Sequence, residues 1–78
     1  MPKFFFDHFE DGSQVASDAV GVELASLEAA RMEADMALAE MAVEQLHQGS
    51  ESNRSIRVRD EEGKTVLLCS LGVTSHTL

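Results

Sequence analysis

Three consecutive phenylalanines near the N-terminus limit the folds open to this chain, within the stretch KFFFDHF at residues 3–9. Successive side chains on a β-strand point to opposite faces. A strand here therefore places Phe4 and Phe6 on one face and Phe5 and Phe9 on the other. Both faces need cover, and a chain of 78 residues has little material to supply it. We expect a helix over one face and a second subunit over the other.

The dipeptide Asp11-Gly12 predicts a two-residue turn after this strand. The chain then returns through the short polar segment SQVAS, which is typical of a sheet edge. This register pairs Phe9 with Gln14 and His8 with Val15. The following residues, 18–24, are expected to form an extended connection.

A long helix is predicted over residues 27–48, which contain neither Gly nor Pro. Ser26 is suited to cap its N-terminus and Gly49 its C-terminus. Residues placed at intervals of 100° form one apolar stripe that should lie on the sheet. Its members are Leu27, Ala30, Ala34, Ala37, Leu38 and Met41.

A second apolar stripe lies nearly opposite the first and is flanked by carboxylates on both sides. Its members are Ala29, Met32, Met36, Ala39 and Val43, spaced three and four residues apart. One interpretation is the scattered exposed apolar surface of an alanine-rich helix. The other is a contact surface for a partner helix, centred on Met32, Met36 and Val43, because this spacing matches the seam of a helix pair.

A second hairpin is predicted from Ser55 to Leu71, with Glu61-Glu62-Gly63 as its loop. The expected pairs are Asp60–Lys64, Val58–Val66 and Ile56–Leu68. This register predicts a core face made of Ile56, Val58, Val66 and Leu68. The opposite face then carries Arg57, Arg59, Thr65, Leu67, Cys69 and Leu71.

The order of elements predicts an α+β fold: two β-hairpins flanking one long α-helix, in the order ββαββ. We expect the helix to pack on one face of a four-stranded, mostly antiparallel sheet. The chain forms a single small domain over residues 1–78. For residues 71–78, a frayed tail and an extension of the last strand to Val73 are both open.

The face away from the helix predicts a homodimer interface, because a soluble domain rarely exposes so many large apolar groups. The proposed interface consists of Phe5, Phe9, Arg57, Arg59, Leu67, Cys69 and Leu71. The two arginines are expected to rim the contact and to pair with carboxylates across it. A rival interpretation folds the tail, residues 71–78, back over Phe5.

The sequence contains no pattern typical of a catalytic, metal-binding or cofactor-binding site. His8, His47, His76 and Cys69 lack the spacing of metal ligands, so we expect no metal and no cofactor. The cluster Asp7, His8, Glu10 and Asp11 is interpreted as a solvated turn. Cys69 has no base placed beside it, which argues against an enzyme.

Fourteen acidic and six basic residues leave a net charge of −8, which argues against nucleic-acid binding. The sequence shows neither a signal peptide nor an apolar run long enough for a bilayer. The single cysteine excludes an internal disulfide and favours the cytoplasm.

The segments MPKFFF, GVELASLEAAR and VRDEEG resemble a family of small uncharacterised bacterial domains from soil and plant-associated species. Members begin with Met-Pro-Arg/Lys-Tyr/Phe-Phe-Phe, and the resemblance implies no activity. A fainter likeness, at fold level, is to the antitoxin half of toxin–antitoxin pairs. The first functional hypothesis is a homodimeric interaction or accessory module without catalytic activity. The alternative is an antitoxin-like regulator that binds a basic protein partner through its acidic surface.

Overall fold

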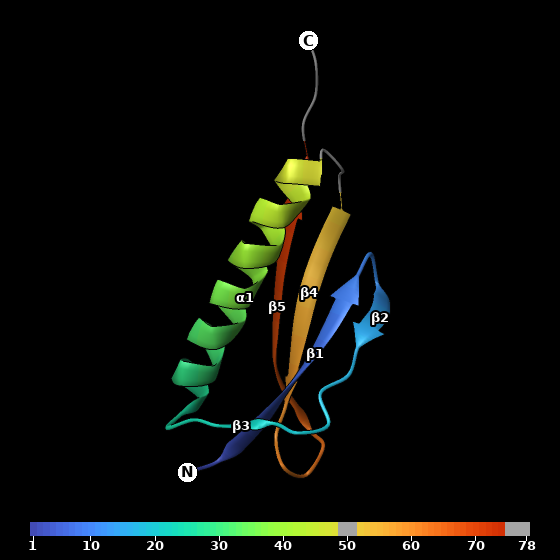
Figure 1. The fold of residues 1–78 in the computed structure, drawn as a ribbon. Coiled ribbons are helices and arrows are strands. Elements are labelled where there is room, and N and C mark those ends of the chain that lie inside the picture. Colours follow the sequence, from blue (N-terminus) through green and yellow to red (C-terminus); the bar gives the residue numbers. More distant parts are fainter. Residues whose placement is uncertain (49–51, 75–78) are drawn as a thin grey trace.

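The structure, a computed structural model, describes residues 1–48 and 52–74. These residues form one α-helix and five strands (Figure 1). The elements are β1 (Lys3–Glu10), β2 (Ser13–Ala16), β3 (Val22–Glu23), α1 (Leu27–Gln48), β4 (Ser52–Arg59) and β5 (Thr65–Val73). The predicted α+β class is confirmed.

All pairings between the described strands are antiparallel, and the sheet runs in the order β2-β1-β4-β5. A fifth strand, β3, pairs with the start of β1 through Lys3–Glu23 and Phe4–Val22. The predicted count of four strands is therefore wrong by one. The reason is that residues Val22–Glu23, expected as a plain connection, run beside β1 on the same side as β2.

The first hairpin has the predicted turn, since Asp11 and Gly12 both adopt positive φ, at 49° and 86°. This geometry matches the right-handed twist of the flanking strands. Phe9 pairs with Gln14 as predicted. His8 pairs with Ala16 rather than Val15, because an irregularity between His8 and Phe9 shifts the register by one residue.

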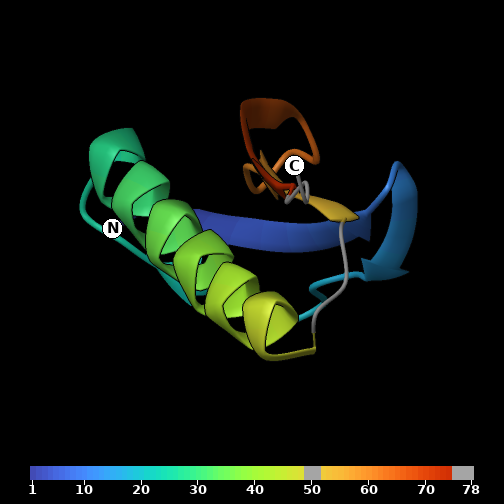
Figure 2. The ribbon, with the colours of Figure 1, turned by 90° about the horizontal axis from the view of Figure 1, so that it is seen from above.

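Helix α1 lies along β4 and β5 on one face of the sheet (Figures 1 and 2). The hydroxyl of Ser26 accepts a hydrogen bond from the N–H of Ala29 at 3.2 Å, which confirms the predicted N-cap. The predicted cap at Gly49 lies outside the described residues. The helix ends at Gln48, as the sequence indicated.

The stripe of α1 that faces the sheet is confirmed in its centre and wrong at its start. Ala30, Ala34 and Leu38 are buried, but Leu27 is 46% exposed. Helical side chains lean toward the N-terminus, so the side chain of the first helical residue projects past the end of the helix. At the other end, Gln45 continues the stripe and is only 2% exposed, although it was not among the residues predicted for this stripe.

The core contains six buried apolar residues from α1, β1 and β4. They are Phe4, Ala30, Ala34, Leu38, Ile56 and Val58. Phe6 packs against this cluster, so the predicted position of Phe4 and Phe6 under the helix is confirmed. Alanine at the centre of the stripe allows α1 to approach the strands closely.

The second hairpin pairs one residue away from the predicted register. Val58 lies opposite Leu67, and Ile56 lies opposite Cys69. The cause is a β-bulge at Val66, between the pairs of Val58 and Arg59. Because side chains alternate, a slip of one residue exchanges the two faces of the strand beyond the bulge.

The prediction that Leu68 belongs to the core is therefore wrong, since its side chain is 63% exposed. Leu67 and Cys69, predicted on the opposite face, pack against the core beneath α1. Leu71 lies opposite Arg54 and is also on the face of the sheet that packs against α1. Strand β5 continues to Val73, so the extended alternative holds for residues 71–73; residues 75–78 lie outside the described part.

Candidate interaction site

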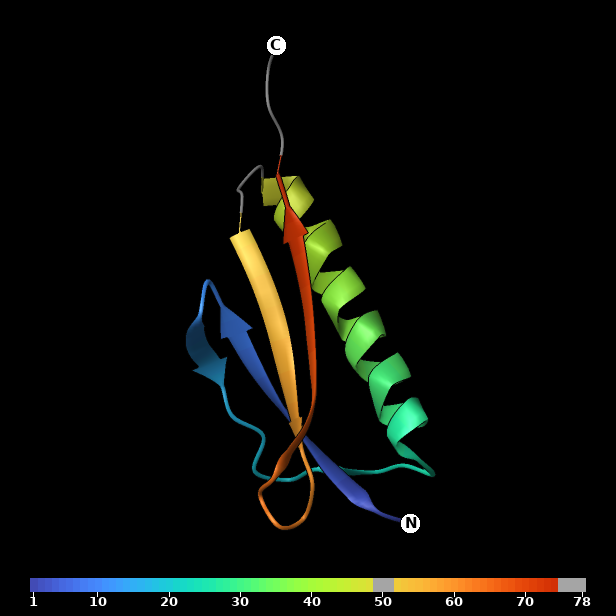
Figure 3. The same ribbon diagram turned by 180° about the vertical axis from the view of Figure 1, so that it is seen from behind.

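The face of the sheet away from α1, here called the open sheet face, is the strongest candidate site. Directly paired residues share a face, so the register assigns its members. They are Phe5, Asp7 and Phe9 of β1, Ser55, Arg57 and Arg59 of β4, and Leu68 and Ser70 of β5. Figure 3 shows this side of the molecule, where no described helix crosses the strands.

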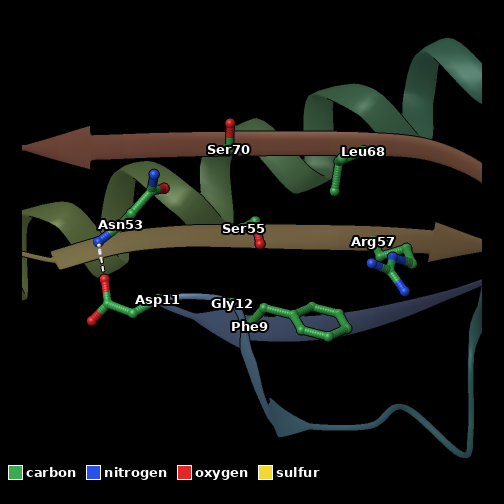
Figure 4. Close-up of a pocket in the computed structure, with 8 residues that line it drawn as sticks. All are labelled: Phe9, Asp11, Gly12, Asn53, Ser55, Arg57, Leu68 and Ser70. Atoms are coloured by element: carbon green, nitrogen blue, oxygen red, sulfur yellow. Dashed lines mark hydrogen bonds between the residues drawn. The ribbon is translucent and has the colours of Figure 1, made fainter.

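The open sheet face contains a hollow of about 310 Å³ (Figure 4). Phe9, Arg57 and Leu68 supply its largest side chains, one from each of three neighbouring strands. The guanidinium carbon of Arg57 lies 4.7 Å from the centroid of the Phe9 ring, a cation–π contact. The hollow therefore combines an aromatic ring, an aliphatic side chain and a positive charge.

A reciprocal pair of hydrogen bonds closes one end of the hollow. The N–H of Asn53 donates to Oδ1 of Asp11 at 2.9 Å, and the N–H of Asp11 donates to the carbonyl of Asn53 at 2.8 Å. These bonds fasten the turn of the first hairpin to the start of β4. This end of the hollow is therefore fixed by hydrogen bonds between the turn and β4.

Phe5 is covered in part by its own chain, and whether a second subunit or the tail covers the rest stays a prediction. A Cβ built at Gly21 would lie 2.8 Å from Cε2 of Phe5, so the backbone of Gly21 is in contact with the ring. The guanidinium carbon of Arg59 lies 5.1 Å from the ring centroid. Phe5 is half-buried as a result.

Asp7 is buried, 6% exposed, and forms an ion pair with Arg59. Nε of Arg59 donates to Oδ2 at 2.6 Å, and Nη2 donates to Oδ1 at 3.1 Å. The N–H of Asp18 and the hydroxyl of Ser17 also donate to Oδ1. The interpretation of Asp7 as part of a solvated turn is therefore wrong. Arg59 pairs with Asp7 on a neighbouring strand of the same chain, and its pairing across an interface stays a prediction.

The contacts of Asp7 lower its pKa. The hydrogen bond from Arg59 is the largest cause and outweighs the opposing effect of burial. For Asp18, burial raises the pKa, but hydrogen bonds from the N–H groups of Gly21, Phe6 and Val20 lower it by more. The pKa of Asp18 is therefore also below its usual value. Both carboxyl groups are therefore stabilised in their charged form.

Asp18 and Arg59 together fasten residues 17–21 to the sheet. Nη2 of Arg59 donates to the carbonyl of Asp18 at 2.8 Å. This attachment is what brings Gly21 onto Phe5. The sequence held one signal for it: an aspartate at the centre of an aromatic strand needs a partner, because a buried charge without one is costly.

Cys69 lies on the helix side of β5 and is not part of the open sheet face. Burial is the largest cause of its raised pKa, followed by the charge and hydrogen bond of Asp35 on α1. A raised pKa lowers the fraction of reactive thiolate. Leu67 and Leu71 lie on the same side as Cys69. The open sheet face therefore lacks three residues of the predicted interface, Leu67, Cys69 and Leu71, and has Leu68 instead.

The second stripe of α1 points away from the sheet, as predicted. Met32, Met36 and Val43 are each more than half exposed. Arg31 on one flank is bound by Glu28 and by Asp35, the latter at 2.7 Å. Whether this stripe contacts a partner stays a prediction.

Within residues 1–48 and 52–74, no group of three or more His, Cys, Asp or Glu side chains could hold a metal ion. In the same part of the chain, no helix has the length and apolar character needed to cross a bilayer.

Comparison with known proteins gives one match. A search of curated proteins and a search of solved structures each found none. A family model described as a domain of unknown function, DUF6894, matches residues 3–72. That match runs from the first residue of β1 almost to the end of β5, and the chain belongs to the DUF6894 family.

Proposed function

We propose that the chain is a homodimeric interaction module without catalytic activity, and that the second subunit contacts β5 and the open sheet face beside it. One observation supports this above the others. Leu68 is 63% exposed in the hollow that Phe9 and Arg57 also line, on a face that no described helix covers. A large aliphatic side chain in such a setting is typical of an interaction surface.

The size of the chain supports the same proposal. Six buried apolar residues form the core, and three of them come from the helix as two alanines and one leucine. Domains of this size often gain stability by oligomerisation. Burying a leucine side chain contributes roughly 1.5–3 kcal/mol, and a two-fold contact counts each such residue twice.

The polar groups of the site suit binding better than catalysis. Asp7 is engaged by Arg59 and has a lowered pKa, and Cys69 has a raised pKa and lies under α1. Arg57 stacks on Phe9 at the edge of the hollow, where a charge orients a partner more than it adds affinity. The free thiol of Cys69 favours a reducing compartment, and we place the protein in the cytoplasm.

Sedimentation equilibrium at micromolar concentration tests the proposal. We expect the natural chain to be a dimer and Leu68→Asp to be a folded monomer, because a desolvated carboxylate opposes association. Val15→Asp is the control, since Val15 on β2 is 56% exposed and lies outside the hollow. A monomeric natural chain would contradict the proposal, and so would a Leu68→Asp dimer as tight as the parent.

A second candidate function rests on α1. The exposed stripe of Met32, Met36 and Val43 is accompanied by Glu33, Glu40 and Glu44, which favours a basic amphipathic helix as partner. An antitoxin-like regulator would bind a basic protein in this way. The probe is a synthetic lysine- and leucine-rich helical peptide; we expect salt-sensitive binding that Met36→Glu weakens at least tenfold and Leu68→Asp leaves unchanged. Equal binding of the peptide by the natural chain, Met36→Glu and Leu68→Asp would exclude this surface.

A further inference from the structure

The outer edge of β5 is the longest free strand edge in the described part of the molecule. β5 is nine residues long and comes last in the sheet order, so no described strand pairs with its outer side (Figure 1). β1 differs, because β2 and β3 both line its second edge. The outermost strand on that side, β2, has only four residues.

β5 also lacks most features that usually protect an edge. Its sequence, TVLLCSLGV, has no charged residue and no proline, although the chain carries twenty charged residues in all. The bulge at Val66 affects one end alone. From Leu67 to Val73 the strand is a regular template for another strand.

The outward-pointing groups of β5 follow from the alternation of an antiparallel ladder. The carbonyl of Asn53 accepts a bond from Asp11 on the β1 side, and the N–H of Asp60 donates to Lys64 on the other side of the ladder. Alternation then directs the odd-numbered residues of β4 toward β1 and the even-numbered ones toward β5. Leu68, Ser70 and Gly72 lie opposite Arg57, Ser55 and Asn53. Their N–H groups therefore point to the free edge.

We propose that two copies of the chain pair in antiparallel fashion along the outer edges of β5, which joins two five-stranded sheets into one. This inference rests on the homodimer proposed above and names its contact. Antiparallel edges are self-complementary about a two-fold axis, because each copy offers the same alternating N–H and C=O groups. A second copy is therefore the occupant that this edge fits directly.

The position of α1 is compatible with such pairing. The helix lies along both β4 and β5, and neighbouring strands are about 4.8 Å apart. In edge pairing, the two-fold axis passes midway between the two β5 strands. A helix centred over β4 and β5 lies about 5 Å from that axis, so the helices of the two copies lie about 10 Å apart. That separation is within the usual range for packed helices, about 8–10 Å. Edge pairing thus brings two helices together without a clash of their backbones.

The flank of α1 that faces the second copy in this arrangement carries little net charge. The flank of α1 nearest β5 is identified by Asp35, which interacts with Cys69. There Arg31 binds Asp35 at 2.7 Å and also pairs with Glu28, so these three side chains together carry a net charge of −1 in a chain of net charge −8. Pairing also shields two apolar side chains of β5, Leu68 on the open sheet face and Leu71 on the helix side, which are 63% and 39% exposed.

Amide hydrogen exchange followed by NMR, on the natural chain at a concentration where sedimentation shows a dimer, tests the contact without mutation. We expect the amides of Leu68 and Ser70 to exchange as slowly as those of Cys69 and Leu71, and to speed up at least tenfold on dilution to monomer. Fast exchange at Leu68 and Ser70 in a proven dimer overturns edge pairing and leaves the homodimer intact. A monomer at every concentration overturns both proposals.

Ser70→Pro provides an independent variant, with Ser70→Ala as its matched control. Proline removes one outward N–H and leaves the bonds between β4 and β5 in place, whereas alanine keeps the N–H. We expect a folded monomer for the first and a dimer for the second. A Ser70→Pro dimer as tight as the parent overturns the inference. If circular dichroism shows that this variant is unfolded, the exchange rates of the natural chain decide.

Discussion

Arg59 and Asp7 form an ion pair between neighbouring strands, with Nε of the arginine 2.6 Å from Oδ2 of the aspartate. The same guanidinium reaches the carbonyl of Asp18, so the pair also holds the connection that follows β2. Sheet and connection thus share one buried carboxylate. This arrangement makes the fold sensitive to acid at one identifiable position.

Asp7→Asn should lower the free energy of unfolding by about 1–3 kcal/mol at neutral pH, because a buried charge-assisted contact is lost. The pKa of Asp7 is lower in the folded chain than in the unfolded one. Its contribution is therefore complete above the unfolded value, about 3.9, and disappears as pH falls through the lower folded value. Urea unfolding at a series of pH values measures this, and the variant should show the smaller loss of stability below about pH 5.

Glu10→Gln is the control for that experiment. Glu10 lies 3.6 Å from Arg54 in a pair that is partly exposed, and such pairs contribute little. We expect its acid profile to match the parent. A parallel profile for Asp7→Asn and the parent would contradict the role assigned to the Asp7–Arg59 pair.

Gly21→Ala should destabilise the fold more than Gly63→Ala does. Both glycines have positive φ, 77° and 81°, which costs a residue with a Cβ about 1–2 kcal/mol. Only Gly21 also has neighbours in the way, with Cε2 of Phe5 at 2.8 Å and Cγ of Lys3 at 2.9 Å from the new Cβ. Thermal unfolding of the two variants compares them directly, and equal melting temperatures would show that Gly21 does not press on Phe5.

Leu67→Ser and Leu68→Ser, neighbours in sequence, should differ sharply in stability. Leu67 packs against the core and Leu68 is 63% exposed. We expect a loss of about 1–3 kcal/mol for the first and less than about 0.5 kcal/mol for the second. Urea unfolding at a concentration where both chains are monomeric gives the two values. A larger loss of stability for Leu68→Ser than for Leu67→Ser would contradict the bulge and support the register predicted from the sequence.

Asp35→Asn should lower the pKa of the Cys69 thiol, because Asp35 is one of the groups that raise it. Removing the carboxylate also leaves Arg31 with one acidic partner fewer, and the positive charge of Arg31 favours the thiolate. The dependence of the rate of alkylation by iodoacetamide on pH gives the pKa. Glu33→Gln changes a carboxylate elsewhere on α1 and should leave the profile unmoved.

Local pattern was sufficient for much of this fold. The turn at Asp11-Gly12, the bounds of α1 and the burial of Phe4 follow from turn chemistry, the absence of helix breakers and the alternation of a strand. Each of these depends on residues close together in the chain. Periodicity also separated the two stripes of α1 correctly, apart from Leu27 at the helix end.

The candidate site was harder to predict, because long-range contacts decide it. Asp7 and Arg59 are 52 residues apart, and no local rule joins them. Phe5 lost much of its exposure to Gly21, which the sequence indicated as part of a plain connection. Phe9 and Arg57 were placed correctly on the open sheet face, whereas Leu68 was not, because a bulge leaves no mark in hydrophobic alternation.

The extra residue at Val66 makes β5 sensitive to length as well as to composition. A relative one residue shorter between Gly63 and Cys69 would present its leucines to the opposite sides of the sheet, even with every other letter identical. An alignment that closes such a gap by similarity would place a core leucine against a surface one. Insertions and deletions in this strand therefore change which side chains lie on each face of the sheet. By such changes, members of one family could acquire different partners while they keep the same fold.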